Sequence, residues 1–185
     1  PAPTSVGRFS YYVSFIDDYS KFTWIYLLKK RSDVFQVFIN FQNLVERKLN
    51  SKIIAMQSDW GGEYEKLNSF FQKLGISHHV SCPHAHQQNG SAERKHRHIV
   101  DMGLALLANA SMPLKFWDEA FLTTPYLINL LPCHSKSSNL KHPLHDSLVS
   151  HPTTHLFVFS VVHVGPTSDP ITHANSLFAP KSVSS

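Results

Sequence analysis

Cysteine is scarce in this sequence, and long apolar runs are absent from it. The 185 residues include two cysteines, Cys82 and Cys133, which excludes the disulfide framework that stabilises many small secreted domains. A reducing compartment is therefore the expected setting. No apolar run is long enough to span a bilayer and no signal peptide is evident, so we expect no membrane partner. Internal repeats are absent as well, so no repeat architecture is expected.

An excess of charge of one sign is also missing. Seventeen Lys and Arg residues against 13 Asp and Glu give a formal net charge of +4, which is compatible with a nucleic-acid partner but does not require one. An ordinary basic soluble protein accounts for the charge equally well. In contrast, apolar residues make up 42% of the chain and include 13 Phe and 3 Trp, which predicts one sizeable packed core.

Strand and helix patterns alternate along the first 132 residues. Apolar runs at 11–16 and 22–28 flank turn residues and predict a hairpin. After Ser32, a suitable N-cap, apolar residues recur at helical spacing. The elements predicted after the hairpin are a helix over 33–49, a strand over 53–58, a helix over 64–74 ended by Gly75, a strand over 76–81, a loop over 83–89, and helices over 90–110 and 113–131. This order predicts an α/β fold with a mixed sheet flanked by helices.

Residues 133–185 have a different composition from the rest of the chain. Ser, His, Pro and Thr are frequent there and hydrophobic periodicity is weak, with one strand-like run at 156–162. We therefore expect a domain over 1–132 followed by an irregular, poorly ordered tail over 133–185.

Two acidic residues stand at boundaries between predicted elements. Asp59 follows the apolar run 53–56, and Glu93 opens the predicted helix 90–110. Two such carboxylates can share divalent metal, which is how many proteins cut and join phosphodiesters. Two simpler interpretations remain open. Asp59 can close a strand into a glycine turn, and Glu93 can stabilise a helix N-terminus by roughly 0.3–1 kcal/mol.

Cationic and polar residues surround Glu93. The cationic ones suit contacts to DNA phosphates that carry no sequence information, although an ordinary solvated helix face is the alternative. A polar loop is predicted immediately before the helix. The candidate DNA-binding residues are Gln88, Asn89, Arg94, Lys95, Arg97 and His98.

Other residues with metal-binding chemistry have simpler explanations. Asp17 and Asp18 lie between the two strands of the hairpin, where turn chemistry accounts for both. A second group has a spacing that matches no familiar closed zinc site, so structural zinc is disfavoured. Its members are His78, His79, Cys82, His84 and His86.

Four motifs occur in one order along residues 1–132. They are Tyr11-Tyr12-Val13-Ser14-Phe15-Ile16-Asp17-Asp18-Tyr19-Ser20, Ser58-Asp59-Trp60-Gly61-Gly62-Glu63-Tyr64, Gln87-Gln88-Asn89-Gly90-Ser91-Ala92-Glu93-Arg94-Lys95, and Phe116-Trp117-Asp118-Glu119-Ala120. With these motifs the sequence resembles the integrase catalytic core of copia-type LTR retrotransposons, part of the retroviral integrase superfamily and of Gag-Pol polyproteins. The first motif resembles the second and third strands of that family.

The resemblance implies an RNase H-like fold and a polynucleotidyl transferase that performs 3′-end processing and strand transfer. In this family three acids bind two Mg²⁺ or Mn²⁺ ions. Asp59 matches the second acid and Glu93 the third. The implied partners are element-end and target DNA and further copies of the integrase, and the implied location of the parent polyprotein is the nucleus or a cytoplasmic particle.

The sequence departs from the family pattern at its start. The first acid of the family lies on the first strand, in an Asp-x-x-Gly-Pro pattern whose final proline resembles Pro1. We therefore expect a fragment with a truncated first strand, whose missing aspartate lies four residues before Pro1, and which is inactive alone. Trp60 and His86 also replace the usual Asn and Pro. A non-catalytic DNA-binding remnant and an RNase H-like nuclease are the alternatives.

Overall fold

The computed structural model describes residues 5–58, 64–80, 86–134, 140–141 and 155–164. Its larger sheet has five strands. They are β1 (Tyr11–Asp17), β2 (Thr23–Leu28), β3 (Ile53–Ser58), β4 (Ser77–Val80) and β7 (His155–His163). The α-helices are α1 (Val34–Leu49), α2 (Tyr64–Leu74), α3 (His86–Asn109) and α4 (Trp117–Leu130). Short elements complete the order, namely the 3₁₀ turns η1 (Arg31–Asp33) and η2 (Leu114–Phe116) and the paired strands β5 (Cys133–His134) and β6 (Leu140–Lys141).

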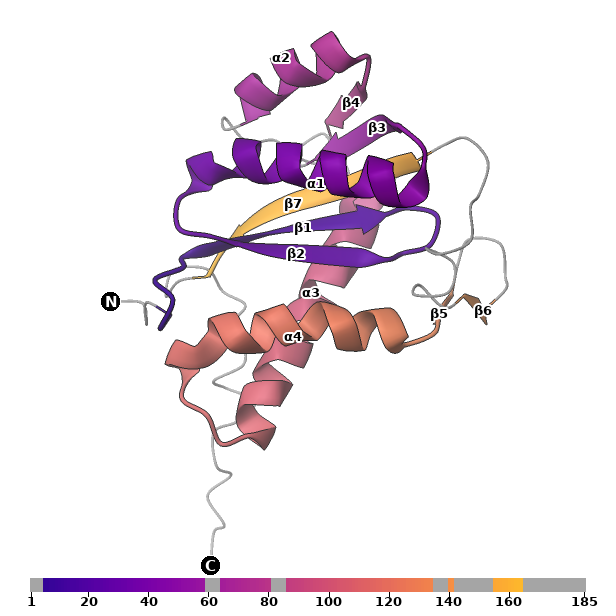
Figure 1. Ribbon diagram of the computed structural model, residues 1–185. Coiled ribbons are helices and arrows are strands. Elements are labelled where there is room, and N and C mark those ends of the chain that lie inside the picture. The colour runs from indigo at the N-terminus through magenta and orange to yellow at the C-terminus, as the bar shows by residue number, and fades with distance from the viewer. Residues whose placement is uncertain (1–4, 59–63, 81–85, 135–139, 142–154, 165–185) are drawn as a thin grey trace, which may run out of the picture.

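The sheet is mixed, as predicted, and has the strand order β2-β1-β7-β3-β4 (Figure 1). The hairpin of β1 and β2 is antiparallel, and β1 is antiparallel to β7 as well. In contrast, β3 runs parallel to both β7 and β4. Because β7 lies between β1 and β3, it joins the hairpin to the parallel half of the sheet.

The central position of β7 was not expected from the sequence. Residues 155–163 belong to the segment predicted to be an irregular tail, yet they pair along both edges with other strands. Phe157 and Phe159 are fully or almost fully buried on one side of the strand. A strand buried on both faces has a nearly continuous apolar sequence, and here that run is short and surrounded by polar composition. Local pattern therefore identified a strand but could not place it in the core.

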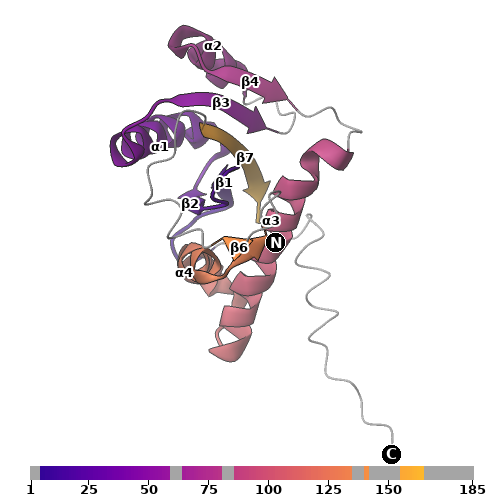
Figure 2. The same cartoon turned by 90° about the vertical axis from the view of Figure 1, so that its right-hand side faces the viewer.

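One face of the sheet packs against α1 and α2, and the other against α3 and α4 (Figure 2). On the first face Phe15 stacks on Phe41 with ring centroids 4.0 Å apart and planes 8° apart, and Phe38 and Phe71 extend the aromatic cluster. Each such side chain contributes roughly 1.5–3 kcal/mol when fully buried. The phenylalanine content of the sequence is thus concentrated in one layer.

The second face is built around Tyr12 of β1. Ile99 and Val100 of α3 and Trp117 and Phe121 of α4 belong to the same buried cluster. Tyr12 and Phe121 have ring centroids 5.5 Å apart. None of the helices in the part of the chain that the structure describes is long and apolar enough to cross a membrane.

Helix boundaries follow the sequence in some places and depart from it in others. As predicted, α2 ends before Gly75, whose φ of +71° is the left-handed conformation that favours glycine. The cap predicted at Ser32 is wrong, because Ser32 lies inside η1 and Asp33 precedes α1. The Asp33 carboxylate instead accepts a hydrogen bond from the backbone N–H of Lys30 at 3.0 Å.

The start of α3 differs most from expectation. The sequence predicted a loop through residue 89 and a helix from Gly90, but α3 begins at His86. Gln88 and Asn89 therefore lie in the first turn of a helix, and Glu93 lies about two turns inside it. Stabilisation of the helix N-terminus by Glu93 consequently falls away, since that effect is confined to the first turn.

Candidate metal and nucleic-acid site

The predicted site lies at the carboxyl ends of the parallel strands. The parallel strands β3 and β4 end there, at Ser58 and Val80. Asp59, the first of the two predicted acids, follows Ser58 directly and lies outside the described residues, as do Trp60, Cys82 and His84. The structure therefore describes the frame that leads to Asp59, and the carboxylate itself stays a sequence prediction.

The end of β3 is held by polar contacts to its neighbours. The buried Ser58 shares a hydrogen bond between its Oγ and Nε2 of His78 at 2.9 Å, and Nδ1 of His78 lies 3.4 Å from Oδ1 of Asn68 on α2. The His78 ring also packs on Phe71 and Phe159, with centroids 5.0 Å and 6.4 Å away. Burial, and then the nearby His79, lower the pKa of His78, so the neutral ring is favoured.

Helix α3 meets the sheet through His96. The hydroxyl of Tyr12 is hydrogen-bonded to Nδ1 of His96, and the two rings lie 5.9 Å apart with planes 23° apart. Farther along α3, Ile99 and Val100 are buried against the same face. Position 93 precedes His96 by three residues and therefore lies on the same face of the helix. Position 93, that of the second predicted acid, therefore lies on the face of α3 that contacts the sheet.

The predicted DNA-contacting residues of α3 differ in exposure. Arg94 and Arg97 are exposed, whereas Lys95 and His98 are half-buried. Burial, followed by the nearby Lys95, lowers the pKa of His98, while Asp101 opposes the shift. The two exposed arginines are therefore better placed than His98 to provide positive charge beside position 93.

The central strand supplies no third acid. None of the nine residues of β7 is Asp or Glu. Ser160 follows Phe159, which pairs with Ser58, and it pairs in turn with the buried Ser14 on β1. Since side chains alternate along a strand and Phe159 faces α1, Ser160 lies on the α3 side of the sheet. A half-buried serine thus occupies the middle of the sheet on the side of the predicted site.

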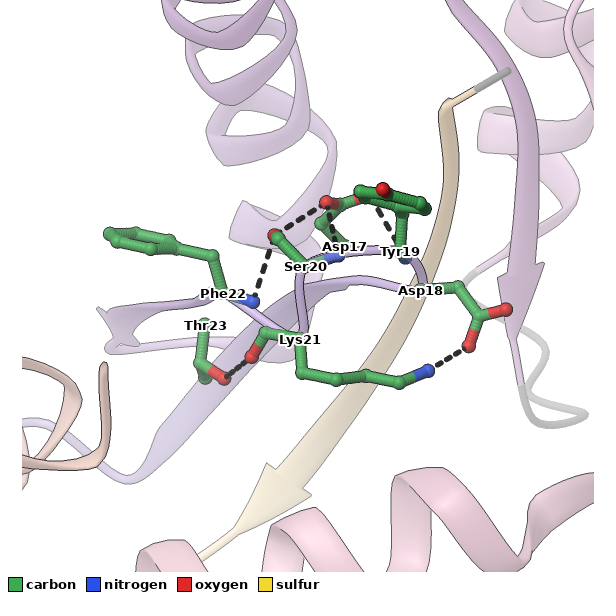
Figure 3. Close-up of polar contacts among 7 residues, drawn as sticks. All are labelled: Asp17, Asp18, Tyr19, Ser20, Lys21, Phe22 and Thr23. Atoms are coloured by element: carbon green, nitrogen blue, oxygen red, sulfur yellow. Dashed lines mark hydrogen bonds and ion pairs between the residues drawn. The ribbon is translucent and has the colours of Figure 1, made fainter. Parts of the chain in front are cut away.

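Asp17 and Asp18 lie at the other end of the sheet and stabilise the hairpin turn (Figure 3). The Asp17 carboxylate accepts hydrogen bonds from the backbone N–H of Ser20 at 2.9 Å and from its hydroxyl at 2.5 Å. Asp18 pairs with Lys21 at 2.5 Å. The turn role predicted for both aspartates is confirmed.

Several residues that organise the site were missed by sequence reasoning. Tyr12 was treated as one residue of a strand, and His96 was not singled out. The spacing of His96 from Glu93 was the one available signal. Asp118, which lies in a recognised motif, is buried and accepts a hydrogen bond from the N–H of Gly7 at 2.8 Å, so it anchors the N-terminal segment to α4.

The layered mixed sheet with helices on both faces defines the class of fold, which is RNase H-like. A cryo-EM structure of a simian T-cell lymphotropic virus intasome in complex with PP2A regulatory subunit B56 gamma aligns with a TM-score of 0.62 at 14% identity, over 84% of this chain and 54% of that one. The catalytic core domain of BIV integrase aligns at 0.49 and 20% identity, over 80% and 90% of the two chains, so the fold assignment rests on the first comparison.

Sequence comparison gives the relationship more closely. No family model matches the chain. The retrovirus-related Pol polyproteins of transposons RE2 and RE1 from Arabidopsis thaliana are 47% and 48% identical over 128 residues, and that of transposon TNT 1-94 from Nicotiana tabacum is 43% identical over 130. Each match covers 69% of this chain, which spans only 9% or 10% of the polyproteins. The chain is a homologue of a segment of retrotransposon Pol polyproteins, which confirms that part of the resemblance. The copia subtype stays a prediction.

Proposed function

We propose that the chain is the integrase-type catalytic core of a retrotransposon Pol polyprotein, a polynucleotidyl transferase core for DNA integration that has two of its three metal-binding acids. One observation carries the proposal. Strand β3 ends directly before Asp59, and α3 turns position 93 toward the same sheet through the contact of His96 with Tyr12. The similarity to transposon Pol polyproteins supports the same reading.

The proposed metal site has two acidic ligands, one fewer than the three acids of the family that the sequence resembles. In this proposal Asp59 and Glu93 hold Mg²⁺ or Mn²⁺, which when bound supplies Lewis acidity to a water or a DNA 3′-hydroxyl. The central strand β7 contributes no acid. Mg²⁺ demands near-octahedral oxygen coordination, so two carboxylates bind it poorly. We therefore expect little or no turnover from this chain alone.

The proposed partner is DNA, both the ends of an element and a target. The exposed Arg94 and Arg97 next to position 93 suit phosphate contacts, and Lys95 can join them by extending its ammonium group to solvent. Like the parent integrase, the chain is proposed to act as a homo-oligomer, within a polyprotein that occupies the nucleus or a cytoplasmic particle.

The test is a strand-transfer assay with the purified chain, oligonucleotide element ends and Mg²⁺ or Mn²⁺. Asp59→Asn and Glu93→Gln serve as controls. We expect salt-dependent DNA binding and no joined product above the level of Asp59→Asn. Turnover that disappears in Asp59→Asn would contradict inactivity, and a lack of DNA binding at low salt would contradict the proposed partner. Cleavage of an RNA–DNA hybrid in the same panel would favour the RNase H-like alternative.

The need for a third acid can be tested by introducing a carboxylate near the proposed site. Ser160→Asp adds a carboxylate on the α3 side of the central strand, and Ser160→Asn adds the same volume without charge. A ligand that binds only the folded state raises stability by RT ln(1 + [L]/Kd), so we expect Mn²⁺ to raise the melting temperature of Ser160→Asp more than that of Ser160→Asn. Equal shifts in the two folded variants would contradict the proposed donor set.

A further inference from the structure

Tyr12 and His96 form an unusual junction between the sheet and α3. The Tyr12 side chain is completely buried in β1, while His96 is half-buried on α3, and their hydrogen bond crosses from one layer to the next. The Tyr12 ring also contacts Phe121 of α4, with centroids 5.5 Å apart and planes 59° apart. One tyrosine therefore connects the central sheet with both helices of this layer.

The hydrogen bond of the pair joins one particular atom of each side chain. Burial raises the pKa of Tyr12 far above its ordinary value, so its hydroxyl stays protonated and can either donate or accept a hydrogen bond. Nδ1 of His96 is the partner atom, and the tautomer of the ring decides which of the two groups donates. The bond thus depends on one particular ring atom, so substitutions that remove or supply a hydrogen-bonding group at that atom test the pair.

The geometry of α3 links this bond to Glu93. Residues 93, 96 and 100 lie along one face of the helix, because three- and four-residue spacings approximate one turn. Val100 is buried farther along, so two points on that face are attached to the sheet. Side chains reach roughly 5–6 Å from a helix axis, so a roll of about 20° moves their ends by about 2 Å. Catalytic groups must be held within about 0.5 Å, which makes such a roll large.

We infer that Tyr12 and His96 are a positioning pair that sets the roll of α3, and thereby the orientation of position 93 relative to the end of the sheet. The inference rests on the proposed function only for the role of Glu93 as a metal ligand. The placement of α3 by the pair stands on the contacts themselves. Neither residue acts on metal or DNA directly, so both act through Glu93.

The experiment uses the full chain and a set of single and double variants, with Mn²⁺ as the probe. Tyr12→Phe removes the hydroxyl and keeps the ring, and His96→Leu removes the partner of that hydroxyl. His96→Asn restores a hydrogen-bonding amide group near the position of Nδ1 and is the rescue variant. Tyr26→Phe is the matched control, because Tyr26 packs on the opposite face of the sheet.

We expect Tyr12→Phe and His96→Leu each to weaken Mn²⁺ binding by about 3- to 10-fold, the range for loss of one hydrogen bond. The double variant should be no weaker than either single one, since both remove the same bond. His96→Asn should recover most of the affinity, and Tyr26→Phe should match the unmodified chain. Amide chemical shifts of residues 94–100 provide a second readout that needs no metal.

The outcomes separate the inference from the proposed function. If Asp59→Asn and Glu93→Gln abolish Mn²⁺ binding but Tyr12→Phe and His96→Leu leave the affinity unchanged, the positioning role is overturned. If Asp59→Asn and Glu93→Gln change nothing, the proposed metal site fails. In that case the amide shifts decide. Matching displacements in Tyr12→Phe and His96→Leu, reversed in His96→Asn, support the pair, and undisturbed α3 amides overturn it.

Discussion

At the scale of single residues, buried polar side chains join segments that lie far apart in the sequence. Asn129 of α4 accepts a hydrogen bond from the N–H of Thr23 through its Oδ1 and donates one to the carbonyl of Thr23 through its Nδ2, both at 2.9 Å. Thr23 belongs to β2, at the outer edge of the sheet. The amide of Asn129 thus satisfies backbone groups that no neighbouring strand can reach.

Substitution of Asn129 by Ala should therefore be costly. It leaves a buried N–H and a buried carbonyl of Thr23 without their partner, and each such loss costs about 1–3 kcal/mol. We expect the free energy of unfolding to fall by about 2–4 kcal/mol in urea titrations followed by circular dichroism. Thr123→Ala on the exposed face of α4 should change it by less than about 0.5 kcal/mol. Similar small effects of both variants would show that the Asn129 contact contributes little.

The lowered pKa of His78 predicts a pH dependence of stability. Its folded-state pKa lies below the unfolded value, so the unfolded chain binds the proton more readily. The stabilising contribution is therefore complete above the unfolded pKa, about 6.5, and is lost as the pH falls from there toward the folded pKa. His78→Gln keeps an amide that can hydrogen-bond Ser58 but does not titrate. The loss of stability between about pH 7 and pH 5 should be smaller in this variant than in the unmodified chain. Parallel pH profiles would contradict the assignment.

How far single residues could be predicted depended on whether their role is local. The turn role of Asp17 and Asp18 follows from chain neighbours and was predicted. Glu93 was placed in a first helical turn, which is wrong because α3 begins at His86. The partners of Tyr12, Asn129 and Asp118 lie 84, 106 and 111 residues away, and no local pattern carries such information.

At the scale of elements, amphipathic and strongly apolar segments were predicted well and context-dependent ones were not. The hairpin, α1 and α2 have the periodicity or turn residues of their structures, so their bounds agree closely with expectation. The first turn of α3 is rich in polar residues and precedes Gly90, which locally favours a loop. The Ser- and His-rich surroundings of β7 hid its role in the core. Both elements acquire their structure from what they pack against.

The central position of β7 predicts a large effect of Phe159→Ala. Removing a fully buried phenylalanine costs about 3–5 kcal/mol, which is a large part of the stability of a domain this size. Phe159 is 1% exposed, so we expect a loss comparable to that of Phe15→Ala on β1. Chemical denaturation measures both.

Leu130→Ala, at a position that is 42% exposed, is the control and should cost far less. If residues 155–163 formed part of an unattached tail, Phe159→Ala would be as mild as this control. Such a result would contradict the observed strand order and would support the irregular tail predicted from the sequence.

At the scale of the whole molecule, the modest net charge matters less than where the exposed cations lie. The chain carries +4 in total, and two exposed arginines are neighbours on α3. Each phosphate contact contributes a slope of about −0.9 to the dependence of log K on log salt for duplex DNA. If α3 is the interface, substitutions of its exposed arginines should change the salt dependence of DNA binding.

The double variant Arg94→Ala, Arg97→Ala should weaken DNA binding and make the salt slope shallower by about 1.8. Fluorescence anisotropy with a labelled duplex over a salt series measures this slope. Lys52→Ala with Lys73→Ala removes the same charge from exposed positions outside α3 and is the control. If both double variants change the slope equally, binding depends on net charge and α3 is not the interface.

The sequence by itself determined the fold class, the hairpin, most helices and the order of the motifs, because these depend on periodicity and on short strings of residues. Tertiary structure alone decided that β7 is the central strand, that α3 begins before its glycine, and that Tyr12 holds the face of α3 that includes position 93. The physical reason is that pairing and burial depend on distant segments. Residues 155–163 become a core strand only because β1 and β3 pair with them on either side.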